Sequence, residues 1–288
     1  MPVVDAVMSA FSTLVHPLQL AVAWLLVRVH ALAAGAGLDP TGGAAWTLAI
    51  VGLVVVVRLV LVPLAVVQVR ALRRSQAIGP ELRRIRARYA GRTDTASRQS
   101  LQREQAELMR ESGANPLLGC LPALVQAPVL FALFATLQGL GRHETVGALT
   151  AGLVREADAA TVLGAPLSGV LWGSGHGPTI AVAAVMIVLM GLTQLVTQHL
   201  AAARNTSPAV LDGNPLARQQ QRVLLWVLPV MVAVPGLHVP VGVLLYWLTS
   251  TLWSLGQQLV VLRVLPNPGS VAERARDERR ARRAARQA

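Results

Sequence analysis

Residues 46–68 read WTLAIVGLVVVVRLVLVPLAVVQ, an apolar run interrupted near its centre by Arg58. About 20 apolar residues are enough for a helix to cross the hydrocarbon core of a bilayer. In a continuous helix that rises 1.5 Å per residue, Arg58 would lie about 16 Å from either end of this run. That is too deep for its side chain to reach the lipid headgroups.

A charge at that depth costs at least about 2.5–3.5 kcal/mol, so something inside the membrane must solvate Arg58. The usual partner is a neighbouring carboxylate, but every Asp and Glu of the chain lies outside the hydrophobic segments. We therefore expect water in a cavity to be the main partner of the guanidinium group. A wet cavity that carries one positive charge inside the bilayer indicates a functional site.

The composition is that of a membrane protein. Of the 288 residues, 53% are hydrophobic and only 14% are charged, and a soluble domain of this length could not bury so much apolar surface. The single cysteine, Cys120, excludes a disulfide within the chain and a cysteine-based metal cluster. The six His residues are scattered and no Gly-rich phosphate loop occurs. We therefore expect no metal, no cofactor and no enzymatic activity.

Five segments are long and apolar enough to be predicted as membrane spans. They are residues 46–68, 116–138, 178–200, 222–237 and 239–262. The last two are joined by PGLHVP at 235–240, where Pro and Gly favour a tight turn between antiparallel helices. The predicted fold class is all-α: a polytopic membrane protein whose core, residues 46–265, is a five-span helical bundle with a cytosolic helical hairpin.

The distribution of arginine predicts the orientation of the chain. All 26 basic residues are Arg, and the net charge is +12. Most of them lie in residues 70–114, in 201–222 and in the tail from 263, whereas 139–177 holds only Arg142 and Arg155. With five spans these two sets fall on opposite sides of the membrane. The positive-inside rule then places the N-terminus outside and the C-terminus in the cytosol.

Three segments outside the spans have distinct characters. Residues 70–114 predict the hairpin, with helices at 76–89 and 95–111 around a turn at 91–94. In the basic tail, 266–288, the stretch 273–286 has no hydrophobic face, so we expect it to be disordered or a transient helix. Residues 1–45 form an N-terminal extracytoplasmic segment with an apolar stretch broken by polar residues. This favours an interfacial helix over a span or a cleaved signal peptide.

Uncharged polar residues inside the spans are candidates for the site around Arg58. Gln126 and Gln194 are bulky and lie deep in the second and third spans, so they could line one hydrophilic groove with Arg58. The alternative is that they hydrogen-bond between helices, which is common in membrane bundles and is our expectation for most Ser and Thr of the fifth span. Trp247 of that span could belong to the core, to an interfacial belt or to a substrate contact.

The order of these features resembles the YidC family of membrane protein insertases. The resemblance rests on VVRLVLVPL at 56–64, the basic hairpin, NPLLGCLPALVQAP at 115–128 and PVGVLLYWLTSTLWSLGQQ at 240–258. It implies an insertase with a hydrophilic groove open to the cytosol and to lipid and closed outside. It also implies that Arg58, Gln126 and Trp247 belong to the groove, with Gln194 a looser match. The chain resembles the shorter type of the family, without a large extracytoplasmic domain.

The resemblance implies nascent membrane proteins as partners and, as a further possibility, the Sec translocon. The arginine-rich tail and hairpin suit ribosomal RNA or anionic lipids. Two other classes remain open from the residues alone. A small-solute transporter or channel would use Arg58 as an anion site, although transporters of this kind often contain internal repeats and none is evident here. A structural assembly factor would not need Arg58.

Overall fold

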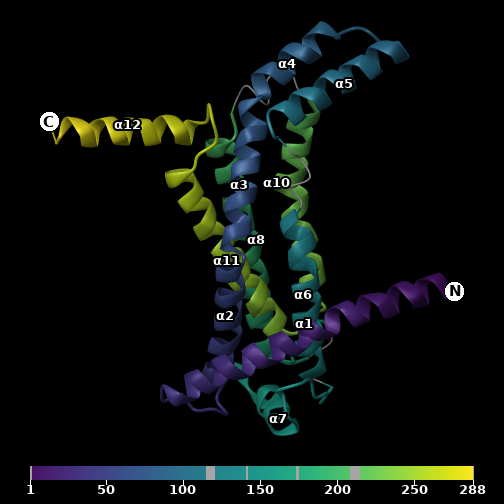
Figure 1. Cartoon of the computed structure of the whole chain (residues 1–288). Coiled ribbons are helices and arrows are strands. Elements are labelled where there is room, and N and C mark those ends of the chain that lie inside the picture. The colour runs from purple at the N-terminus through teal and green to yellow at the C-terminus, as the bar shows by residue number, and fades with distance from the viewer. Residues whose placement is uncertain (1, 115–120, 141, 173–174, 208–214, 288) are drawn as a thin grey trace. The chain divides into compact units, whose positions relative to one another are not determined.

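The computed structural model describes residues 2–114, 121–140, 142–172, 175–207 and 215–287, and these are almost entirely helical (Figure 1). The helices are α1 (Pro2–Gly35), α2 (Gly43–Val60), α3 (Val62–Ala77), α4 (Gly79–Arg88), α5 (Thr95–Glu111), α6 (Leu121–Leu140), α7 (Ala151–Ala159), α8 (Gly177–Asn205), α10 (Pro215–Gly236), α11 (Val241–Val264) and α12 (Val271–Ala285). Strands β1 (Thr161–Val162) and β2 (Ala165–Pro166) pair antiparallel. The predicted all-α class is confirmed.

The chain forms two compact units. The first contains residues 1–61, 123–193 and 229–253, and the second contains 62–122, 194–228 and 254–288. Helices α8, α10 and α11 each contribute to both units. The parts of the candidate site around Arg58 lie in the first unit, and the basic hairpin and tail lie in the second.

The core of the first unit is apolar and tightly packed. Trp46, Ile50 and Leu53 of α2 are fully buried, together with Leu133 of α6 and Leu244 of α11. The three residues of α2 recur three or four positions apart, which places them on one face of that helix. The space between α2, α6 and α11 at these residues is therefore filled by apolar side chains.

Helix α1 is attached to this core at a large angle, since it runs obliquely across α2 in Figure 1. The ring of His30 stacks on that of Trp46 at 4.1 Å, and its Nε2 is 2.9 Å from the carbonyl oxygen of Pro40. The helices approach so closely that a Cβ on Gly52 would lie 2.5 Å from Cγ1 of Val29. Gly52 therefore permits the crossing.

Length and composition leave the number of spans open. Among the residues that the structure describes, three helices are long and apolar enough to cross a membrane: Val15–Gly35, Gly43–Val60 and Gly177–Asn205. The first is the segment for which an interfacial position is predicted, and its oblique course across α2 agrees with that position (Figure 1). The interfacial helix and the count of five spans both remain predictions. Part of the second predicted span, residues 115–120, lies outside the described residues.

The single helix predicted for residues 46–68 is wrong. Helix α2 ends at Val60, and α3 begins at Val62. Pro63 explains the interruption, because its ring nitrogen has no N–H to donate to a carbonyl of the preceding turn. As a consequence Arg58 lies in the last turn of α2, not in the middle of a long helix.

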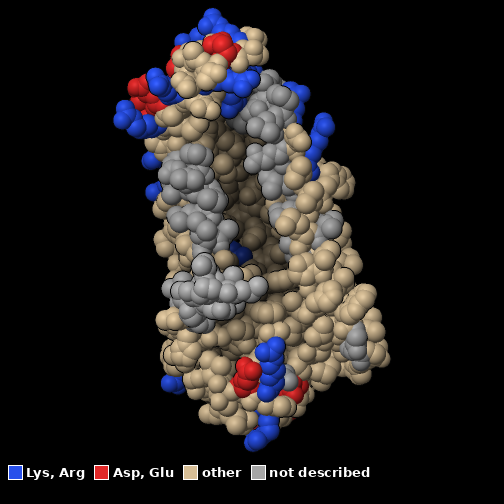
Figure 2. All heavy atoms as spheres, turned by 90° about the vertical axis from the view of Figure 1, so that its right-hand side faces the viewer, with Lys and Arg blue, Asp and Glu red and all other residues tan. Residues whose placement is uncertain are grey.

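The hairpin of the second unit has the predicted form, with one difference. Helix α5 has the predicted bounds, but the helix predicted at 76–89 is interrupted at Ile78, and α4 starts at Gly79 with Pro80 in its first turn. Tyr89 and Arg88 of the α4 end both bond Glu104 of α5, each at 2.6 Å. Figure 2 shows the basic and acidic side chains gathered over this hairpin.

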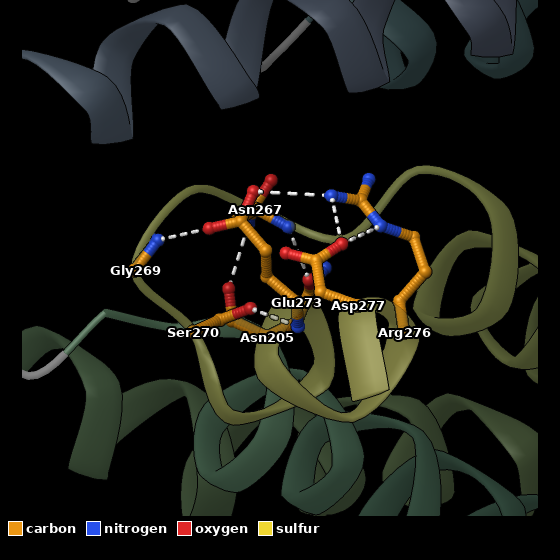
Figure 3. Close-up of polar contacts among 7 residues, drawn as sticks. All are labelled: Asn205, Asn267, Gly269, Ser270, Glu273, Arg276 and Asp277. Atoms are coloured by element: carbon orange, nitrogen blue, oxygen red, sulfur yellow. Dashed lines mark hydrogen bonds and ion pairs between the residues drawn. The ribbon is translucent and has the colours of Figure 1, made fainter. Parts of the chain in front are cut away.

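The expectation that residues 273–286 are disordered or only transiently helical is wrong, because residues 273–285 belong to α12. Two local contacts explain this helix. The Ser270 hydroxyl accepts from the Glu273 N–H at 3.2 Å, and the Glu273 carboxylate accepts from the Gly269 N–H at 2.8 Å (Figure 3). Such reciprocal capping satisfies donors that a helix start otherwise leaves unpaired. Arg276 adds ion pairs to Glu273 and Asp277.

A second set of bonds fixes the start of the tail to the end of α8. The Asn267 N–H donates to Oδ1 of Asn205 at 2.9 Å, and Nδ2 of Asn267 donates to the Asn205 carbonyl at 2.8 Å (Figure 3). Asn205, Asn267 and Ser270 are all buried. We call these three residues the polar junction. It holds the segment before α12 against α8.

Candidate functional site

Arg58 bonds to Ser250 of α11 through one guanidinium nitrogen. Its Nη2 donates to the Ser250 hydroxyl at 2.5 Å and is 3.3 Å from the Ser250 carbonyl oxygen. The Nε of Arg58 is buried and has no hydrogen-bond partner among the described residues. A hydrogen bond to a charged group contributes about 1.5–3 kcal/mol. That is comparable to the smallest estimate of the burial cost, about 2.5–3.5 kcal/mol.

The structure adds a protein partner to the water expected around Arg58, and water as the main partner stays a prediction. A neutral serine on the facing helix accepts from one end of the guanidinium group. Because Ser250 carries no charge, it leaves the positive charge of Arg58 uncompensated. The position in the last turn of α2 is also favourable, since the C-terminal end of a helix dipole stabilises a cation.

Gln126 makes a second polar bond between helices. Its Nε2 lies 2.6 Å from the hydroxyl of Tyr246, so the amide of α6 donates to a side chain of α11. Gln126 is half-buried, and Tyr246 is buried within the core cluster. In a dry environment this bond satisfies two groups that would otherwise be costly to leave unpaired.

Helix α11 brings these two bonds together. Tyr246 and Ser250 are four residues apart, so they lie on one face of α11 about 6 Å apart along its axis. The structure therefore places Arg58 and Gln126 within about one helical turn of each other along this face. Trp247 is half-buried and packs against the core cluster of the same unit.

Gln194 belongs to the other compact unit. It is half-buried on the part of α8 that belongs to the second unit. Its place in a common groove with Arg58 remains a prediction.

The sequence analysis assigned most Ser and Thr of the fifth span to helix packing and did not identify Tyr246 and Ser250 as partners of the candidate site. Their spacing of four in an otherwise apolar helix was the available signal. Their neighbours behave differently: the hydroxyls of Thr249 and Thr251 donate to carbonyls of α11 itself, each at 2.8 Å. Of these hydroxyl groups, those of Tyr246 and Ser250 are the ones that bond side chains of other helices.

The polar cluster lies at the edge of the apolar core. On α11, residues 241–246 are all buried, whereas 247–251 are half-buried. On α2, the buried residues run from Ala45 to Val54, and Arg58 follows one turn later. The site is therefore bounded on one side by packed side chains that exclude water.

The chain is similar to a known family over most of its length. The family model described as "60Kd inner membrane protein" matches residues 38–268. Several curated relatives carry the name membrane protein insertase YidC. The relative from Streptomyces avermitilis is 39% identical over 284 residues, which cover 96% of this chain and 63% of that protein.

Two relatives are matched over more of their own length. The one from Tropheryma whipplei is 35% identical over 285 residues, 96% of this chain and 92% of the relative. The one from Bifidobacterium longum is 31% identical over 261 residues, 89% of this chain and 77% of the relative. These names give no support to the alternative of a small-solute transporter.

Proposed function

The chain belongs to the 60Kd inner membrane protein family, that of the membrane protein insertases, and on this premise we propose how it inserts nascent membrane proteins. It is a multi-pass protein of the bacterial membrane. The observation that carries the mechanism is the bond from Arg58 to a neutral serine. Such a charge is balanced by no carboxylate within the described part of α2 and α11, so it can attract an acidic group of an incoming chain.

In this mechanism Ser250 is the resting partner of Arg58. A carboxylate of the nascent chain forms a charge-assisted and often bidentate pair with a guanidinium group, which is stronger than a bond to a hydroxyl. The incoming acid therefore displaces Ser250 and gains a partner part-way across the bilayer. This lowers the barrier for a hydrophilic segment that would otherwise have to enter lipid.

The neighbouring polar groups extend this path. We propose that Gln126 and Trp247 contact the translocating segment next to Arg58, and that Gln194 contributes from α8. Glutamine can donate and accept hydrogen bonds without charge. Such groups would accommodate many sequences, as an insertase requires.

The proposed groove is open toward the cytosol and closed outside. The packed core of Trp46, Ile50, Leu53 and Leu244 supports a closed outer end. The N-terminus then lies outside and the C-terminus in the cytosol, in agreement with the positive-inside rule. The arginine-rich hairpin and α12 would face the cytosol, where ribosomal RNA, anionic lipids and the Sec translocon are the proposed partners.

Reconstituted proteoliposomes test this proposal. The substrate is a single-span protein with an acidic outer segment, and its insertion is measured by protease protection. We expect Arg58→Ala to reduce insertion about tenfold and Arg58→Lys to retain most of it. Arg155→Ala, at an exposed position in α7, is the matched control and should have no effect.

Two results would contradict the proposal. If the Ala and Lys variants lose activity equally, the shape of arginine matters and not its charge. If a substrate without acidic residues suffers as much as the acidic one, attraction of carboxylates is not the mechanism. Flux of a small anion into proteoliposomes that contain the protein but no substrate would support a channel instead.

A further inference from the structure

An apolar hollow lies between α8 and α10 within the second unit. Leu195, Val196, His199 and Leu200 of α8 and Leu225 and Trp226 of α10 line a space of about 350 Å³. This volume is at the lower end of the range for ligand pockets. Trp226 is 67% exposed beside it. Apart from His199, every lining side chain is apolar, so the hollow offers its occupant a hydrocarbon surface.

Two arginines lie beyond the same end of this hollow. On α8, Val196, Leu200 and Arg204 are spaced by four, so they form one row that ends at Arg204 in the last turn. On α10, Arg222 precedes Trp226 by four residues and shares its face. Both arginines are exposed.

The two rows run toward the same membrane surface. Only residues 206–214 connect α8 and α10, and both helices line the hollow, so they are antiparallel neighbours. The C-terminal end of α8 and the N-terminal end of α10 therefore lie on the same side. Arg204 lies about one turn, or 6 Å, nearer to that side than Leu200, and Arg222 lies the same distance nearer than Trp226.

We propose that this hollow binds one acyl chain of an anionic phospholipid whose phosphate lies between Arg204 and Arg222. The arrangement has the two elements that such a lipid needs: apolar walls at chain depth and positive charge at headgroup depth. Basic residues between membrane helices on the cytosolic side are suited to anionic headgroups. A zwitterionic lipid could fill the hollow but would gain much less from the two charges.

This inference is independent of the insertase mechanism. It requires that α8 and α10 cross the membrane, and it rests on the proposed orientation only for the leaflet, which would be the cytosolic one. It also differs from the proposed lipid contacts of the hairpin and tail, because it places a whole lipid molecule at a defined pair of helices.

Quenching of tryptophan fluorescence tests the site in the full chain. The protein is reconstituted in phosphatidylcholine containing increasing amounts of brominated-chain phosphatidylglycerol or brominated-chain phosphatidylcholine. The signal of Trp226 is the difference between the unmodified protein and Trp226→Phe. We expect half-maximal quenching at about tenfold lower mole fraction for the anionic lipid.

Matched variants separate charge from packing. In the double variant Arg204→Gln with Arg222→Gln, the mole fractions of the two lipids at half-maximal quenching should become nearly equal. Arg204→Lys with Arg222→Lys should keep most of the preference for the anionic lipid. Arg142→Gln with Arg155→Gln removes two exposed charges from the loop 139–177 and should leave the ratio unchanged. Val196→Phe fills the hollow without altering charge and should weaken quenching by both lipids.

Equal quenching by the two lipids in the unmodified protein would overturn the proposal, since the hollow would then be ordinary lipid-facing surface. A preference that survives the double glutamine variant would overturn it as well. The lysine and Val196→Phe variants keep the test decisive if the glutamine variant fails to fold.

Discussion

The guanidinium group of Arg58 lies against the hydroxyl of Ser250, 2.5 Å from Nη2 to Oγ, although 192 residues separate them in the chain. A cation inside a membrane protein is thus held by a neutral acceptor. Such a partner stabilises the charge without cancelling it. The same contact ties the last turn of α2 to the middle of α11.

Replacing Ser250 by alanine should destabilise the protein, because it removes the hydroxyl acceptor of a partly buried charge. We expect a loss of about 1–3 kcal/mol in the free energy of unfolding. Thr251→Ala is the control, since that hydroxyl bonds only the carbonyl of Leu248 in its own helix. Unfolding in mixed micelles measures both, and equal losses would mean that the Arg58 contact contributes nothing specific.

The bond between Gln126 and Tyr246 should appear as coupling between the two positions. Tyr246→Phe and Gln126→Leu each leave one polar group of the pair without its partner, whereas the double variant leaves none. We therefore expect the double variant to be more stable than the sum of the single losses predicts, by about 0.5–3 kcal/mol. A double-mutant cycle of unfolding free energies checks this, and simple additivity would argue against the bond.

Thiol labelling should distinguish the closed end from the open end. In a Cys120→Ser background, cysteine at Leu53 or Leu245 should not react with an impermeant reagent added outside, because both side chains are almost fully buried. Cysteine at Leu163, which is 86% exposed in the loop 139–177, should react and serves as the control. Cysteine at Val62 should react from the cytosolic side. Labelling of Leu53→Cys from outside would contradict a sealed outer end.

The start of α5 should lose stability in acid. Hydrogen bonds from Ser97 lower the pKa of Asp94, which caps this helix. A carboxyl group with a lowered pKa in the folded state stabilises that state above its unfolded pKa of about 3.9, and this contribution is lost as the pH falls through the folded value. Hydrogen exchange at Ser97, corrected for intrinsic rates, should show protection declining over this window. In Asp94→Asn this decline should be absent; an identical decline would assign it to another group.

The basic tail should contribute to ribosome binding. Removing residues 271–288 deletes α12 and leaves Asn267 with its partner Asn205. We expect weaker co-sedimentation with ribosomes, and a smaller loss of binding as salt increases, because fewer counterions are released. If the shortened chain sediments as well as the full chain at every salt concentration, the hairpin of α4 and α5 is the principal contact.

The sequence was sufficient to predict the class of fold and to single out Arg58 as a candidate site residue, for identifiable reasons. Long apolar segments can only be helices in a membrane, and a lone arginine within one of them is conspicuous. The helix break at Leu61 was readable from Pro63, and the start of α12 from Ser270 and Glu273, which have the spacing of a capping box. Both signals were outweighed by the composition of the surrounding segments.

The partners of the site could not be read in the same way. Ser250 is one of several small polar residues on α11, and only the packing of α2 against that helix selects it from Thr249 and Thr251. The bonds between Asn205 and Asn267 join positions 62 residues apart and depend on the paths of two helices. Local pattern contains no information on such pairings.

The polar junction has a consequence for how the tail meets a polyanion. A free tail of the same composition would distribute its arginines over a large volume, and binding would have to restrict that motion. Helix α12 instead holds them along a single helix about 22 Å long, at 1.5 Å per residue. The segment before its N-terminal end is fixed to α8 by the polar junction. The entropy of ordering these charges is lost during folding rather than on contact, so a negatively charged partner meets an array that is already spaced.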